Sequence, residues 1–71
     1  MNWDRIKGNW NQFKGNIKQN FGQLTDDDIM QINGQQDVLL GRLQQRYGYT
    51  KDVAQQKLND FLNNIKEPQK V

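Results

Sequence analysis

An acidic run in the middle of this 71-residue chain has side chains that could do chemistry. Asp26, Asp27 and Asp28 are consecutive, and carboxylates can bind Mg²⁺ or transfer protons. Successive side chains on a helix point about 100° apart, so the three carboxylates cannot converge on one ion. The threonine before them also predicts a helix start, where acids are favourable in any case. We therefore expect no metal site and no catalytic site here.

A second group is basic and aromatic. Arg42 and Arg46 are four residues apart, and Lys51 follows them. Tyr47 and Tyr49 lie beside these cations in the sequence. Cations that bind phosphates, next to rings on which bases stack, are typical of surfaces for single-stranded nucleic acid. A solvated helix face with Tyr47 in the core is favoured by the modest net charge of +2 and the lack of a known nucleic-acid motif. Arg42, Arg46, Lys51 and Tyr49 are the candidate nucleic-acid contacts.

The composition argues against several classes of enzyme. The chain has no cysteine and no histidine, so it lacks thiolate chemistry and the commonest general base. Nine asparagines and eleven glutamines accompany one alanine and one glutamate, and the mean hydropathy is −1.08. We expect a non-enzymatic protein without a cofactor, whose partners the sequence does not identify. Because no apolar run approaches the roughly 20 residues of a membrane span and no signal segment precedes the first helix, a cytoplasmic monomer is expected.

The apolar residues recur at steps of three and four, which is the period of an α-helix. In the first helix, expected near 3–21, we expect Trp10, Phe13 and Phe21 in the core and Trp3 partly exposed at a fraying end. Three more helices are expected, near 26–33, 36–47 and 51–65. The chain is thus predicted to form a single all-α domain, a small bundle of about four helices with connections of two to four residues.

Several residues mark the predicted helix ends. Thr25 and Thr50 are expected N-caps, while Gly22 and Gly48 follow aromatic residues and suit the left-handed position after a helix. The Asn33-Gly34 pair favours a break over one continuous helix. A proline at position 68 ends the last helix, and a frayed tail is expected at 67–71.

The glycines follow a regular spacing. They are seven residues apart in two copies, which indicates a duplicated helical unit: Gly8, Gly15 and Gly22, then Gly34, Gly41 and Gly48. A glycine inside a helix costs about 1 kcal/mol relative to alanine. The interior glycines could allow close packing of another helix, face solvent and weaken their own helix, or contact a ligand. Alanine at Gly8 and Gly15 separates the first two interpretations.

Three segments carry a resemblance to a known family. They are Gly15-Asn-Ile-Lys-Gln-Asn-Phe-Gly22, Leu24-Thr-Asp-Asp-Asp28 and Gly41-Arg-Leu-Gln-Gln-Arg-Tyr-Gly48. Over residues 2–62 the chain resembles the CsbD-like family of small bacterial stress-response proteins. The resemblance implies a small helical domain, with two α-hairpins packed across each other as one arrangement, and offers no catalytic or binding residues to carry over. The composition is also similar to that of hydrophilins, the hydrophilic proteins linked to water deficit.

The expected function is therefore a non-enzymatic general stress response, carried out by association with other macromolecules or by their protection. The alternative is a nucleic-acid-binding accessory protein that uses the basic patch of Arg42, Arg46 and Lys51.

Overall fold

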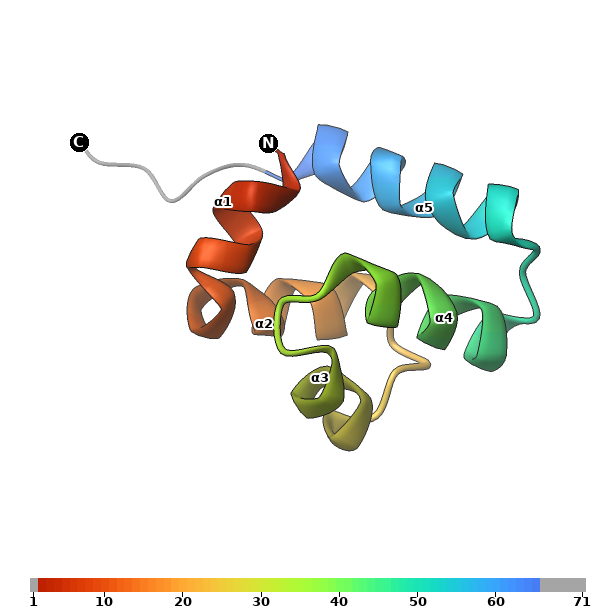
Figure 1. Ribbon diagram of the computed structural model, residues 1–71, viewed down its shortest axis with the longest axis horizontal. Helices are drawn as coiled ribbons and strands as arrows, with labels where there is room; N and C mark the ends of the chain where they lie inside the picture. Colours follow the sequence, from red (N-terminus) through yellow and green to blue (C-terminus); the bar gives the residue numbers. More distant parts are fainter. Residues whose placement is uncertain (1, 66–71) are drawn as a thin grey trace.

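The computed structural model describes residues 2–65, and α-helices are the only regular elements in that range (Figure 1). The five helices are α1 (Trp3–Gly8), α2 (Trp10–Asn20), α3 (Asp26–Ile32), α4 (Gln36–Tyr47) and α5 (Lys51–Asn64). The all-α bundle predicted from the sequence is confirmed, as are the helices expected near 26–33, 36–47 and 51–65. The tail expected at 67–71 lies outside the described residues.

The longer helices α4 and α5 run antiparallel and form one α-hairpin (Figure 1). Of the other three helices, α1 and α3 are short; α3 packs against α4, and α2 packs against α1 and α3. Every helix contributes to one core, because the apolar residues recur on one face of each. Its largest fully covered side chains are Ile6, Ile17, Leu24, Ile32, Leu39, Leu43 and Leu58.

The first helix is broken, and the prediction of one continuous helix over 3–21 is wrong. Gly8 ends α1, Asn9 takes the non-helical angles φ −124° and ψ 42°, and α2 begins at Trp10. Glycine and asparagine are both poor helix formers, and the Asn9 side chain bonds the Arg5 carbonyl at 3.1 Å. The break changes the direction of α1, so that its first residue, Trp3, contacts the turn between α3 and α4.

Trp3 is the residue that makes this long-range contact. Its side chain is buried, and its indole Nε1 donates a hydrogen bond of 2.9 Å to the carbonyl oxygen of Gly34. Trp10 is only half-buried, with its ring centroid 6.2 Å from that of Trp3. The expectation that Trp3 is partly exposed is therefore wrong, because the break carries Trp3 inward. Trp10 packs against the core without being fully buried. Phe13 and Phe21 are buried as predicted.

The predicted helix ends are mostly confirmed. Thr25 and Thr50 each accept a hydrogen bond from the first turn of the following helix. Gly48 is left-handed at φ 73°, and the predicted break occurs at Asn33 and Gly34, which are left-handed at φ 44° and 81°. Gly22 is the exception, since it does not adopt a positive φ. The preceding helix, α2, ends at Asn20, and its C-cap residue is Phe21 with φ −118°.

The interior glycines face open space. A Cβ atom built at Gly8, Gly15 or Gly41 would meet nothing within 4 Å, so the close-packing interpretation is wrong at these positions. Gly34 differs, because its φ is +81° and a Cβ there would lie 3.5 Å from the Lys7 side chain. Gly34 is the one glycine that combines a left-handed backbone with a neighbouring side chain close to the position of a Cβ atom.

We therefore expect alanine at Gly15 or Gly41 to raise the free energy of unfolding by about 1 kcal/mol each, because alanine has the higher helix propensity. Thermal unfolding followed by circular dichroism should show a rise of about 4–8 °C for each variant. Gly34→Ala is the matched control and should lower stability by about 1 kcal/mol, because it forces an alanine into the left-handed region. A lower melting temperature for Gly15→Ala would contradict the prediction.

Candidate functional site

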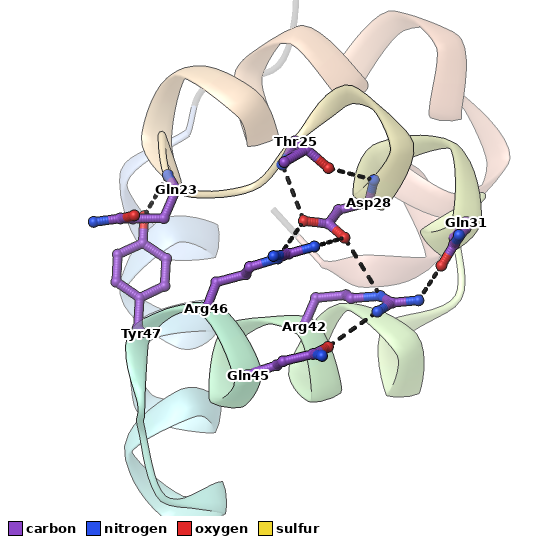
Figure 2. Close-up of polar contacts among 8 residues, drawn as sticks. All are labelled: Gln23, Thr25, Asp28, Gln31, Arg42, Gln45, Arg46 and Tyr47. Atoms are coloured by element: carbon purple, nitrogen blue, oxygen red, sulfur yellow. Dashed lines mark hydrogen bonds and ion pairs between the residues drawn. The ribbon is translucent and has the colours of Figure 1, made fainter.

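A buried carboxylate lies at the junction of α3 and α4. Asp28 is 2% exposed and is the one buried charged side chain in the range 2–65. It belongs to a capping box: the Thr25 hydroxyl accepts from the Asp28 backbone N–H at 3.1 Å, and the Asp28 carboxylate accepts from the Thr25 N–H at 3.0 Å. The first turn of α3 thus fixes the carboxylate in a position that faces α4 (Figure 2).

Two arginines from α4 point at this carboxylate (Figure 2). Arg46 donates from Nε to Asp28 Oδ2 at 2.8 Å and from Nη2 to Oδ1 at 3.0 Å. Arg42 Nε lies 3.7 Å from Asp28 Oδ1. The guanidinium of Arg42 also bonds Gln45 at 3.0 Å and the side chain of Gln31. The bidentate geometry of Arg46 is the stronger kind of charge-assisted pair, so this cluster ties α3 to α4.

The cluster changes the acidity of its members. The hydrogen bonds from Arg46 lower the pKa of Asp28 from 3.8 to about 2, and the bonds from Thr25 act in the same direction against the opposing effect of burial. The same contact raises the pKa of Arg46. Asp28 therefore stays ionised at any physiological pH, and the cluster serves as a fixed ionic contact and not as a proton donor or acceptor.

This pKa predicts how stability depends on pH. Because the folded-state pKa of Asp28, about 2, lies below the unfolded value of 3.8, its stabilisation is complete above about pH 5 and is lost as pH falls toward 2. The loss amounts to about 2 kcal/mol. Urea denaturation of the wild type and of Asp28→Asn across this interval checks the prediction. The variant should lose less stability than the wild type, and equal losses would contradict the role of Asp28.

The wild type must be compared with Asp28→Asn because a second carboxylate also loses a stabilising contact when it is protonated at low pH. The pKa of Asp26 is also lowered, by a hydrogen bond from Lys18 Nζ at 2.8 Å. Asp26 is exposed, and salt should weaken its contact.

The remaining candidate residues lie around the α4–α5 loop. Tyr49 stacks on Tyr47 with ring centroids 5.0 Å apart, and Lys57 Nζ lies 5.9 Å from the centre of the Tyr49 ring. The Tyr47 hydroxyl accepts from the Gln23 backbone N–H at 3.2 Å. Lys51 is the first residue of α5 and is exposed. The half-buried Tyr47 therefore lies at the edge of the core, which is close to its expected place.

The structure thus divides the candidate set in two. Arg42 and Arg46 are brought together around Asp28, whereas Tyr49 and Lys51 lie at the loop. Their contact with nucleic acid stays a prediction. Sequence reasoning placed Asp28 in the first turn of a helix but did not pair it with the arginines. The signal available was the capping-box spacing from Thr25, which singles out one acid of the three.

The surface carries open hollows to whose lining asparagine and glutamine side chains contribute. Two of them, of about 410 and 570 Å³, share Lys7 and Asn33. Within residues 2–65, no three His, Cys, Asp or Glu side chains are placed to hold a metal ion. In the same range, no helix combines the length and apolar character that a membrane crossing requires.

These features define a small helical domain with an ionic α3–α4 junction and an amide-covered surface. The model of the family described as CsbD-like matches residues 4–61, and the chain belongs to this family. It is 51% identical over 61 residues to the UPF0337 protein YjbJ of Escherichia coli, with 86% of this chain and 88% of the relative covered. It is 46% identical over 65 residues to the UPF0337 protein PA4738 of Pseudomonas aeruginosa, with 92% and 100% covered. The UPF0337 protein pc0632 of Protochlamydia amoebophila is 48% identical over 61 residues, with 86% and 92% covered.

Proposed function

We propose that this protein is a non-enzymatic stress protein that protects other macromolecules by associating with them through its amide surface. The observation that carries the proposal is the placement of the amides. All nine asparagines are exposed, and of the ten glutamines within residues 2–65 seven are exposed and three are half-buried. None of these 19 side chains is buried, although they make up a large share of a short chain.

Such a surface suits non-specific protection. A side-chain amide both donates and accepts hydrogen bonds, so it can replace water at a protein surface of either charge. The modest net charge of +2 adds little selectivity for polyanions. Exposed interior glycines at positions 8, 15 and 41 lower the stability of the helices that carry the amides. Lower stability lets the helices open and spread hydrated side chains over a partner.

The experiment is protection of a labile enzyme during drying or repeated freezing. We expect activity to be retained at low molar ratios of this protein to enzyme. The control is an unrelated small helical protein of similar net charge and ordinary amide content. Protection no better than that of the control would overturn the proposal.

The variant Gly15→Ala/Gly41→Ala tests the role of opening within the same protein. It keeps every amide and stabilises the helices. We expect it to protect less well than the wild type. Equal protection would assign the effect to the amide surface alone and would overturn the part of the proposal that requires opening.

A second candidate, nucleic-acid binding, rests on one observation. Lys51 and Lys57 are exposed on the first two turns of α5, and Lys57 Nζ lies 5.9 Å from the centre of the Tyr49 ring. Retention on single-stranded DNA should then fall steeply with salt, and Lys51→Gln/Lys57→Gln should reduce the slope. Retention without salt dependence would exclude this candidate. A cytoplasmic location and a monomeric state are part of the proposal and are tested by fractionation and by sedimentation.

A further inference from the structure

The turn between α3 and α4 contains a sequence with its own chemistry. Asn33-Gly34 is the one asparagine-glycine pair in the chain. When an asparagine precedes glycine, no side chain shields the following backbone nitrogen, and that nitrogen can attack the side-chain carbonyl carbon. Asparagine followed by a bulky residue reacts much more slowly, so the chain carries its own reference sites at Asn20, before Phe21, and Asn64, before Ile65.

The folded backbone holds the reacting atoms apart. Ring closure requires the Gly34 nitrogen and the Asn33 Cβ to lie on the same side of the Asn33 Cα–C bond. At the observed φ of 44° and ψ of 43°, tetrahedral geometry at Cα places that nitrogen on the side away from Cβ. The Asn33 side chain is exposed and makes no hydrogen bond within the described part of the chain. It is therefore the backbone conformation, and not burial or hydrogen bonding of the amide, that prevents the reaction.

Two hydrogen bonds maintain this conformation. The Gln35 N–H donates to the Ile32 carbonyl at 2.7 Å across the turn, and Trp3 Nε1 donates to the Gly34 carbonyl at 2.9 Å. Gly34 is itself buried beneath Lys7 of α1. Rotating Asn33 into the reactive geometry moves the Gly34 peptide, so it requires the turn to open and the contact with Trp3 to be released.

We propose that Asn33 is a spontaneous deamidation site protected by the folded α3–α4 turn, so that loss of its amide records the time for which this turn is open. In the reaction, a bond forms between the Gly34 nitrogen and Asn33 Cγ, the nitrogen loses its proton to solvent, and the side-chain amide leaves as ammonia. Water then opens the resulting succinimide ring at either of its two carbonyls. The products are an aspartate or an isoaspartate at position 33, and no oxidant or reductant takes part.

The isoaspartate product alters the fold. It routes the main chain through the former side-chain carbon, which lengthens the backbone by one atom between α3 and Gly34. The Gly34 carbonyl then no longer meets Trp3 Nε1 in the observed geometry. Deamidation therefore releases α1 from the turn, and the reaction is irreversible without a repair enzyme.

The test compares the folded protein with the same protein unfolded in urea, at one pH and temperature. Peptide mass spectrometry measures amide loss at Asn33, with Asn20 and Asn64 as internal references. In urea we expect Asn33 to react fastest. In the folded protein its rate should fall by about tenfold or more, which corresponds to an opening free energy of at least about 1.4 kcal/mol. Equal rates at Asn33 in the two states would overturn the proposal, and this comparison requires no variant.

Trp3→Phe tests the link to α1, because it keeps an aromatic ring and removes the donor to Gly34. We expect amide loss at Asn33 to become several-fold faster in the folded variant and to stay unchanged in urea. A folded variant with the wild-type rate would overturn the protective role of Trp3. In the wild type, the isoaspartate fraction should lose hydrogen-exchange protection of the Trp3 indole N–H; retained protection would contradict the release of α1.

Discussion

Replacing Asp28 with alanine should lower the free energy of unfolding by about 3 kcal/mol. The substitution removes the bidentate partner of Arg46 and the acceptor for the Thr25 N–H in one step. Breaking a buried ion pair by removing one partner is costly because the remaining charge is left unpaired, and Asp28 is only 2% exposed. The Arg46 side chain is 38% exposed and can regain water, which places the effect toward the lower end for such pairs. Urea denaturation at neutral pH measures the change.

The chain offers a matched control one residue away. Asp27 is exposed, lies in the same first turn of α3 and makes no hydrogen bond or ion pair within residues 2–65. Asp27→Ala should therefore cost less than about 1 kcal/mol, through the helix dipole alone. A double-mutant cycle of Asp28→Ala with Arg46→Gln isolates the coupling between the two side chains. If Asp28→Ala were no more destabilising than Asp27→Ala, the ionic junction would have no part in stability.

Truncating the core should have an effect of similar or greater size. Leu43 lies on α4, has 0% exposure and belongs to the cluster that all helices share. Leu43→Ala should lower the free energy of unfolding by about 3 kcal/mol or more, because the surrounding helices cannot close the cavity completely. A domain of this length has little stability in excess of that figure, so we expect the variant to be largely unfolded at 37 °C by circular dichroism.

Met30 provides the comparison for this variant. It is a large apolar residue on α3, but its side chain is 73% exposed. Met30→Ala should change stability by less than about 0.5 kcal/mol. A Leu43→Ala protein with wild-type unfolding behaviour would contradict the placement of Leu43 at the centre of the core.

Features encoded by neighbouring residues were predictable from the sequence. The N-caps at Thr25 and Thr50 and the left-handed Gly48 depend only on the local backbone, and the structure confirms all three. The break at Asn9 was not predicted, because the apolar period continues through it without interruption. The observed direction of α1 is held by the contact between Trp3 and Gly34, which are 31 residues apart. No local pattern contains that information.

The candidate site also depends on a long-range contact that local sequence patterns do not contain. The spacing of Arg42 and Arg46 correctly indicated that the two side chains share a helix face. The residue they face, Asp28, is 18 residues from Arg46 and becomes its partner only because α3 packs against α4. Two of the three cations in the basic patch, which the sequence offered as an alternative nucleic-acid surface, therefore contact Asp28 in the structure. The third cation of the patch, Lys51, is exposed on α5.

The order of helix contacts has a consequence for the rate of folding. The main contacts join α1 to α2, α2 to α3, α3 to α4 and α4 to α5, so each helix packs chiefly on its neighbour in the chain. Helical proteins with such low contact order fold in microseconds to milliseconds, because few long loops must close before favourable contacts form. The bond between Trp3 and Gly34 closes one of the longer loops, and we expect it to form last. A chain with this topology is therefore expected to regain its structure within milliseconds after dilution from denaturant.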